Sequence, residues 1–75
     1  MYVAKLAKKG NDRVIQKVGE EAVELIIAAK NSDRTKVVAE TADLLFHLFI
    51  LLSTQKISLK EIFAELEKRS QKSEQ

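Results

Sequence analysis

The most constraining feature of this sequence is an apolar stretch from Leu44 to Leu52 that only His47 interrupts. It lies within a predicted helix from about Arg34 to Thr54, whose apolar side chains point in nearly every direction at about 100° per residue. A helix that is apolar all round must be covered on all sides. Two short helices cannot easily cover it, so the sequence predicts a homodimer. The stretch is too short to span a bilayer, and we expect no membrane contact.

The composition favours an all-α fold. The 75 residues amount to one small domain, 1–75, and a chain of this size buries only roughly 60% of its unfolded surface. Cysteine is absent, which excludes disulfides and thiolate metal sites, and a single histidine argues against a zinc site. Proline is also absent and glycine occurs twice, so little turn chemistry is left for a multi-stranded β protein.

Another helix is predicted from about Asp12 to Lys30, and its connection to the next helix is only about three residues long. Asn31 is a candidate left-handed stop, and Ser32 or Asp33 a candidate cap for the helix that follows. Such a short connection predicts an antiparallel hairpin. The core-facing stripe of the first helix consists of Val14, Ile15, Val18, Ala22, Leu25, Ile26 and Ala29.

A third helix is predicted after Ser58, which forms a capping box with Glu61. Its apolar residues are Leu59, Ile62, Phe63 and Leu66. Residues 1–10 are an uncertain lead-in, and the polar tail 70–75 is expected to fray. The predicted architecture is therefore an antiparallel helical hairpin plus a third helix, completed into a helical bundle by dimerisation.

The charge distribution argues against nucleic acid and against export. A net charge of +2 is too small to indicate a nucleic-acid partner. No signal-peptide pattern opens the chain, so we expect a cytoplasmic protein. Positive charges nevertheless gather in the first seventeen residues, at Lys5, Lys8, Lys9, Arg13 and Lys17.

Carboxylates form one stripe on each hairpin helix. Glu21, Glu24 and Glu20 share a face of the first helix, beside its apolar stripe, and Glu40 and Asp43 share a face of the second. Like charges at these spacings repel, so a cluster formed across the hairpin needs cations. Carboxylate oxygens without thiolates suit Mg²⁺ or Mn²⁺.

Each of these interpretations has a simpler alternative. An acidic run on a helix is usually a solvated face, although the apolar helix around Glu40 and Asp43 offers little such face. A lone histidine such as His47 is more often hydrogen-bonded and half-buried than a general base. The N-terminal lysines form a solvated face, or they contact a polyphosphate whose metals bind the carboxylates.

Four motifs make the chain resemble the phosphoribosyl-ATP pyrophosphohydrolases of histidine biosynthesis, within the MazG-like all-α nucleotide pyrophosphatases. The resemblance covers roughly residues 2 to 69. The wider superfamily shares only the carboxylate pairs Glu21/Glu24 and Glu40/Asp43. The motifs are Lys5-Leu6-x-x-Lys9-Gly10-x-Asp12-Arg13, Gln16-Lys17-Val18-Gly19-Glu20-Glu21-Ala22-x-Glu24, Ala28-Ala29-Lys30-Asn31 and Glu40-Thr41-Ala42-Asp43-Leu44-Leu45-Phe46-His47-Leu48.

The resemblance implies Mg²⁺-dependent hydrolysis of phosphoribosyl-ATP to phosphoribosyl-AMP and pyrophosphate, the second step of histidine biosynthesis, with Mn²⁺ as an alternative ion. Glu20 and Glu21 would be catalytic, and Glu20 would either bind metal or orient water. The implied metal ligands are Glu20, Glu21, Glu24, Glu40 and Asp43. The implied substrate-binding residues are Lys9, Arg13, Lys17, Lys30 and Asn31.

Two other functions stay open at this point. One is a house-cleaning pyrophosphatase for non-standard nucleoside triphosphates, and the other is a non-catalytic helical assembly module. Family members are expected to carry a further helix ahead of the element that begins at Tyr2, whereas here Met1 directly precedes it. A chain without that helix would be expected to have less apolar cover for its small core.

Overall fold

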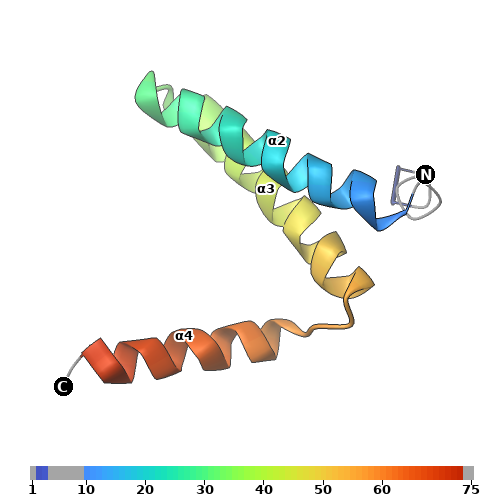
Figure 1. Cartoon of the computed structure of the whole chain (residues 1–75). Helices are drawn as coiled ribbons and strands as arrows, with labels where there is room; N and C mark the ends of the chain where they lie inside the picture. Colours follow the sequence, from blue (N-terminus) through green and yellow to red (C-terminus); the bar gives the residue numbers. More distant parts are fainter. Residues whose placement is uncertain (1, 4–9, 74–75) are drawn as a thin grey trace.

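The computed structural model describes residues 2–3 and 10–73, and residues 10–73 form three helices (Figure 1). Helix α2 spans Asn11–Lys30, α3 spans Arg34–Thr54 and α4 spans Leu59–Ser73. Helices α2 and α3 lie side by side and antiparallel, while α4 turns away from the end of α3 (Figure 1). The described part of the chain holds no strand, so the predicted hairpin with a third helix is confirmed.

The turn between α2 and α3 corrects one prediction. Ser32, not Asn31, adopts the left-handed conformation, with φ of 52° against −87° for Asn31. The reason is the hydrogen bonding: the Ser32 N–H donates to the Ala29 carbonyl at 3.1 Å, and the Asp33 N–H donates to the Ala28 carbonyl at 3.2 Å. This pair of bonds is a Schellman motif, in which the left-handed residue is the one just beyond the C-cap.

Side-chain caps confirm where the next two helices begin. Asp33 Oδ1 accepts a hydrogen bond from the Lys36 N–H at 3.2 Å, so Asp33 is the cap of α3. The predicted capping box of α4 is also confirmed, because the Ser58 N–H donates to Glu61 Oε2 at 2.8 Å and the Glu61 N–H donates to Ser58 Oγ at 3.3 Å. The expected frayed tail, 70–75, is helical as far as Ser73, and its last two residues lie outside the described part.

The core between α2 and α3 is thin. Among the described side chains, the buried apolar residues are Val14 and Ala28, and the buried polar residues are Glu21 and His47. At the open end of the hairpin, Thr54 Oγ1 lies 2.8 Å from Asn11 Oδ1, which joins the end of α3 to the start of α2. The buried positions are therefore concentrated where the two helices meet.

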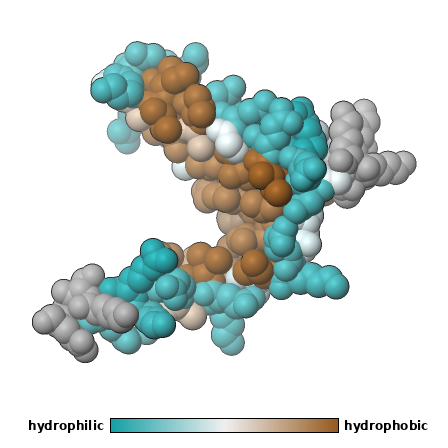
Figure 2. Space-filling view, viewed as in Figure 1, coloured by the Kyte–Doolittle hydropathy of each residue, from teal (hydrophilic) through white to brown (hydrophobic). Residues whose placement is uncertain are grey.

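Much of the remaining apolar surface is exposed. Figure 2 shows it along the middle of the molecule and on the facing part of α4. Phe63 is 62% exposed and Phe49 is 48% exposed. An apolar surface of this extent on a small soluble chain normally marks a contact with another protein or with a membrane.

We expected no membrane contact because the apolar stretch from Leu44 to Leu52 is too short to span a bilayer. Helix α3 as a whole is longer than this stretch. Its 21 residues are long and apolar enough, by length and composition alone, to cross a membrane, and it is the one such helix in the described ranges. Core helices of soluble proteins pass the same test. Glu40 lies on α3 and faces carboxylates of α2, an arrangement that fits a protein interior better than lipid. The absence of membrane contact stays a prediction.

Candidate metal centre

The hairpin brings three carboxylates together. Glu21 and Glu24 come from successive turns of α2, and Glu40 comes from the facing turn of α3. One oxygen from each lies within 4.8 Å of the others. Glu21 is only 6% exposed, whereas Glu40 is half-buried and Glu24 is exposed. We call these three residues the carboxylate cluster.

Two oxygens of the carboxylate cluster lack a hydrogen-bond donor. Glu21 Oε2 and Glu40 Oε2 are buried and have no hydrogen-bond partner among the residues that the structure describes. A hydrogen bond in which protonated Glu40 shares its proton with the Glu24 carboxylate, together with desolvation and the Glu21 carboxylate, raises the pKa of Glu40 to about 7. Buried polar oxygens without partners are rare in native proteins and call for an explanation. A divalent cation would supply one, because it binds carboxylate oxygens and offsets their repulsion.

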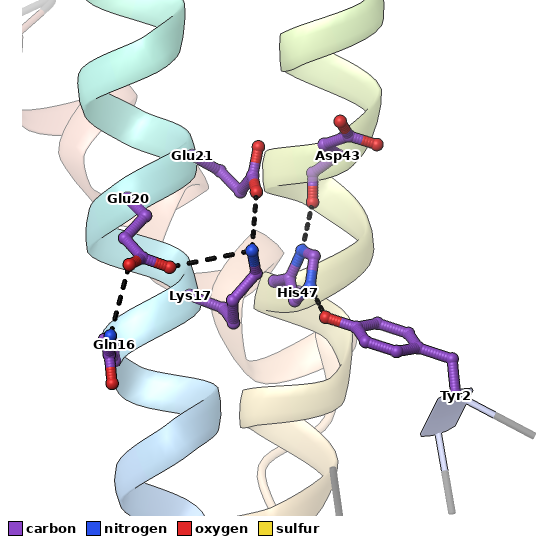
Figure 3. Close-up of polar contacts among 7 residues, drawn as sticks. All are labelled: Tyr2, Gln16, Lys17, Glu20, Glu21, Asp43 and His47. Atoms are coloured by element: carbon purple, nitrogen blue, oxygen red, sulfur yellow. Dashed lines mark hydrogen bonds and ion pairs between the residues drawn. The ribbon is translucent and has the colours of Figure 1, made fainter. Parts of the chain in front are cut away.

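Lys17 provides part of the missing positive charge. Its Nζ lies 3.3 Å from Glu21 Oε1 and 3.6 Å from Glu20 Oε1 (Figure 3). The hydrogen bond to Glu21 is the main cause of the raised pKa of Lys17. Lys17 therefore contacts one oxygen of the Glu21 carboxylate, while the second oxygen has no partner among the described residues.

Glu20 lies outside the carboxylate cluster. Its Oε2 accepts a hydrogen bond from Gln16 Nε2 at 3.1 Å, and its side chain is 46% exposed. The Gln16 hydrogen bond, with the charges of Lys17 and Arg13, lowers the pKa of Glu20. Glu20 is thus held as an anion one turn from Lys17, and its expected roles as ligand or base stay predictions.

Asp43 also lies outside the carboxylate cluster. In Figure 3 its carboxylate points away from Glu21, and the residue is exposed. The step of three residues from Glu40 turns Asp43 by about 60° around α3, away from the facing oxygens of α2. The structure therefore brings together three of the five expected metal ligands, and metal binding by Asp43 stays a prediction.

His47 is a hydrogen-bonded interior residue. It is 5% exposed, and its Nδ1–H donates to the Asp43 carbonyl at 2.8 Å. A neutral ring in that tautomer leaves Nε2 as an acceptor, and the Tyr2 hydroxyl donates to it at 2.7 Å (Figure 3). The Phe46 ring packs against both side chains. The plainer interpretation of His47 fits this geometry, whereas the contact with Tyr2 was not predicted.

The expected substrate-binding residues divide between two grooves that share Glu24. Arg13 and Lys17 line an open groove of about 840 Å³ on α2. Asn31 lines a groove of about 240 Å³ near the α2–α3 turn, together with Lys36, which we did not predict. Lys30 does not line either groove, and Lys9 lies outside the described residues.

The fold and the site together define a small all-α protein in which a helical hairpin presents carboxylates suited to a divalent cation, beside Arg and Lys. Comparison with known families identifies which such protein this is. The pattern of the phosphoribosyl-ATP pyrophosphohydrolase family matches residues 1–70, and the chain belongs to this family. The resemblance inferred from the motifs is confirmed.

Individual relatives agree with this assignment. The phosphoribosyl-ATP pyrophosphatase of Metallosphaera sedula is 53% identical over 68 residues, which cover 91% of this chain and 73% of that protein. The protein of the same name from Methylibium petroleiphilum is 50% identical over 68 residues, covering 91% of this chain and 57% of its own length. The histidine biosynthesis bifunctional protein HisIE of Halalkalibacterium halodurans is 47% identical over 74 residues, which are 99% of this chain and 35% of that protein. The chain thus spans only part of each relative.

Proposed function

We propose that this chain hydrolyses the α–β phosphoanhydride of phosphoribosyl-ATP, giving phosphoribosyl-AMP and pyrophosphate in histidine biosynthesis, with Mg²⁺ as its metal and Mn²⁺ as a substitute. Membership of the family supports the reaction. The main support for the position of the site is the carboxylate cluster, in which two buried oxygens lack hydrogen-bond partners. Both point to a cation between α2 and α3.

Glu21, Glu24 and Glu40 are the residues that would hold the metal, because hard divalent cations prefer carboxylate oxygens. When bound, such an ion neutralises phosphate charge and makes water a better nucleophile at neutral pH. Asp43, one turn along α3 from Glu40, is our candidate for a further ligand.

The neighbouring residues would bind substrate and orient water. Arg13 and Lys17 line the groove that reaches Glu24, so an anion bound there lies beside the carboxylate cluster. Lys17 can exchange its contact with Glu20 for a phosphate oxygen without leaving Glu21. Glu20, whose pKa is lowered chiefly by the hydrogen bond from Gln16, stays ionised at neutral pH and can accept a proton or a hydrogen bond from water.

We also propose that the chain acts as a cytoplasmic homodimer. An apolar groove of about 390 Å³ lies between α3 and α4, and its lining includes Leu48, Phe49 and Phe63. A chain of this length buries too little apolar surface alone, and a second copy would cover this groove. The same contact would explain why α3 is apolar on the sides that α2 does not cover.

A pyrophosphate-release assay tests the proposed reaction. Phosphoribosyl-ATP is compared with a panel of nucleoside triphosphates, each with Mg²⁺ and with a chelator. We expect release from phosphoribosyl-ATP in the presence of Mg²⁺ and none with the chelator. Preferential release from another triphosphate would favour the house-cleaning function, and no release from any substrate would favour a non-catalytic assembly module.

A further inference from the structure

The groove at the α2–α3 turn begins at the carboxylate cluster. Glu24 and Glu40 both line it, so a cation held by the carboxylate cluster would lie at its inner end. Asn31 and Lys36 line it as well, nearer the turn. Ala28, which is buried, also lines it. Two carboxylates thus stand at one end of this groove, and the Asn31 amide, the Lys36 ammonium group and a third carboxylate, that of Asp33, lie nearer the turn.

Lys36 is the one basic residue among those that line this groove. It is exposed, and within the described residues no carboxylate oxygen lies within ion-pair distance of its Nζ. The nearby Asp33 carboxylate is already used, because its Oδ1 accepts the backbone N–H of Lys36 at 3.2 Å. The Lys36 ammonium therefore remains available to a ligand, in contrast to that of Lys17, which contacts Glu20 and Glu21.

We propose that Lys36 is a substrate-binding residue that contacts a phosphate group of the substrate in the groove at the α2–α3 turn. This inference rests on the proposed function. A phosphate bound there would meet Lys36, could accept a hydrogen bond from Asn31, and would lie next to the metal at Glu24 and Glu40. An ammonium group and a divalent cation on two sides of one phosphate are a common way to bind it.

The size of the groove limits what it holds. At about 240 Å³ it is smaller than the roughly 300–1,000 Å³ of pockets that enclose a drug-sized ligand, so it takes one group and not the whole nucleotide. The substrate offers two such groups, the leaving pyrophosphate and the phosphate on the phosphoribosyl unit. The open groove with Arg13 and Lys17, on the other side of Glu24, would then receive the opposite end of the substrate.

Three variants test this proposal. Lys36→Met removes the charge, Lys36→Arg keeps it, and Lys68→Met is the control for the loss of one lysine, because Lys68 is an exposed lysine on α4 that lines neither groove. The hydrogen bond to Asp33 survives in all three, since it uses the backbone of Lys36. Far-UV circular dichroism confirms that each variant is folded.

We expect Lys36→Met to raise KM for phosphoribosyl-ATP about ten- to hundredfold, the range for one lost charge-assisted hydrogen bond, with a smaller change in kcat. Lys36→Arg should restore most of the affinity, and Lys68→Met should leave KM unchanged. Binding of pyrophosphate and of ribose 5-phosphate, each measured by calorimetry with Mn²⁺, identifies the phosphate: the ligand that Lys36→Met weakens is the one in this groove.

An unchanged KM and unchanged binding of both phosphate ligands in Lys36→Met would overturn the proposal. An equal loss in Lys68→Met would overturn it too, because a general effect of charge would then explain the data. If the unmodified chain released no pyrophosphate from any nucleotide, the proposed function would fail. Ligand binding by Lys36→Met would still decide whether Lys36 binds phosphate.

Discussion

Where α3 faces α2, the buried residues that the structure describes are Val14, Glu21 and Ala28 of α2 and His47 of α3, so two of the four are polar. On the side that faces α4, the side chains are apolar and many of them are exposed. Burying carboxylates without partners destabilises a fold unless something binds them, and exposing apolar side chains does so unless something covers them. This difference supports our proposals that the side of α3 facing α2 binds a metal and that the side facing α4 contacts a second copy of the chain.

The largest expected effect comes from removing one charge from the carboxylate cluster. Glu24→Gln and Glu40→Gln should each lower Mg²⁺-dependent pyrophosphate release by at least about a hundredfold, more than the loss typical of groups that only support metal ligands. Without metal, both variants should be as stable as the parent or slightly more stable, because repulsion within the carboxylate cluster falls.

Activity and thermal unfolding of the same preparations measure both effects. Glu67→Gln, an exposed position on α4, is the control for the loss of one carboxylate. A variant that hydrolyses substrate at the parent rate would show that its residue is not a metal ligand. A variant that unfolds would show a structural role.

A charge in the apolar groove between α3 and α4 should weaken the proposed dimer. Phe63→Glu replaces an exposed ring that lines the groove between α3 and α4, and it should weaken self-association at least about tenfold, given about 1.5–3 kcal/mol for full burial of such a side chain. Sedimentation equilibrium measures the association, and Lys68→Gln on α4 is the polar control. A parent chain that stays a folded monomer of 8.5 kDa at micromolar concentration would contradict the dimer.

Without metal, the Glu40 carboxyl group should make the stability of the fold depend on pH. Glu24, burial and Glu21 raise the pKa of Glu40 from 4.5 to about 7, so the folded state favours the protonated form. The stability that this proton provides is complete below about pH 4.5 and is lost as the pH rises to about 7. The Tm in a chelator should therefore fall across this window, and the fall should be smaller in Glu40→Gln.

Two other pKa shifts affect stability outside this pH range. The raised pKa of Lys17, due mainly to its hydrogen bond with Glu21, contributes stability that is lost only above pH 10.5. The lowered pKa of Glu20, due mainly to Gln16, contributes stability that is lost only below pH 4.5. An equal fall of Tm in the parent and in Glu40→Gln would assign the pH dependence to other groups.

The smallest expected effect comes from removing the hydrogen bond between Tyr2 and His47. Tyr2→Phe removes the hydroxyl that donates to His47 Nε2 at 2.7 Å and should lower the free energy of unfolding by about 0.5–1.5 kcal/mol. Urea unfolding measures the loss. In a His47→Gln background the same change should have a smaller effect, which is the double-mutant test of a direct contact. Equal losses in both backgrounds would argue against the Tyr2–His47 hydrogen bond.

Local signals in the sequence predicted most of the fold. An apolar stripe indicated α2, a long apolar segment indicated α3, and the three-residue connection between them predicted the hairpin. The capping box of Ser58 and Glu61 indicated the start of α4. The position of the left-handed residue was missed by one, because it depends on which carbonyls the turn satisfies and not on whether Asn31 or Ser32 suits that conformation better.

The candidate site was predictable only in part. Spacing alone placed Glu21 and Glu24 on one face, but the register of α3 against α2 decides that Glu40 joins them while Asp43 points elsewhere. The contact of His47 with Tyr2 joins residues 45 positions apart, and no local pattern indicates it. The position of Lys36 in a groove likewise depends on how the turn folds.

Calorimetric titration of Mn²⁺ at pH 7, without substrate, tests the central claim that the carboxylate cluster is a metal site. We expect the parent chain to bind Mn²⁺ and to release part of a proton, because Glu40, with a pKa of about 7, is partly protonated there. Binding should be lost or greatly weakened in Glu40→Gln and unchanged in Glu67→Gln. No binding by the parent chain, or equally tight binding by Glu40→Gln, would contradict the claim.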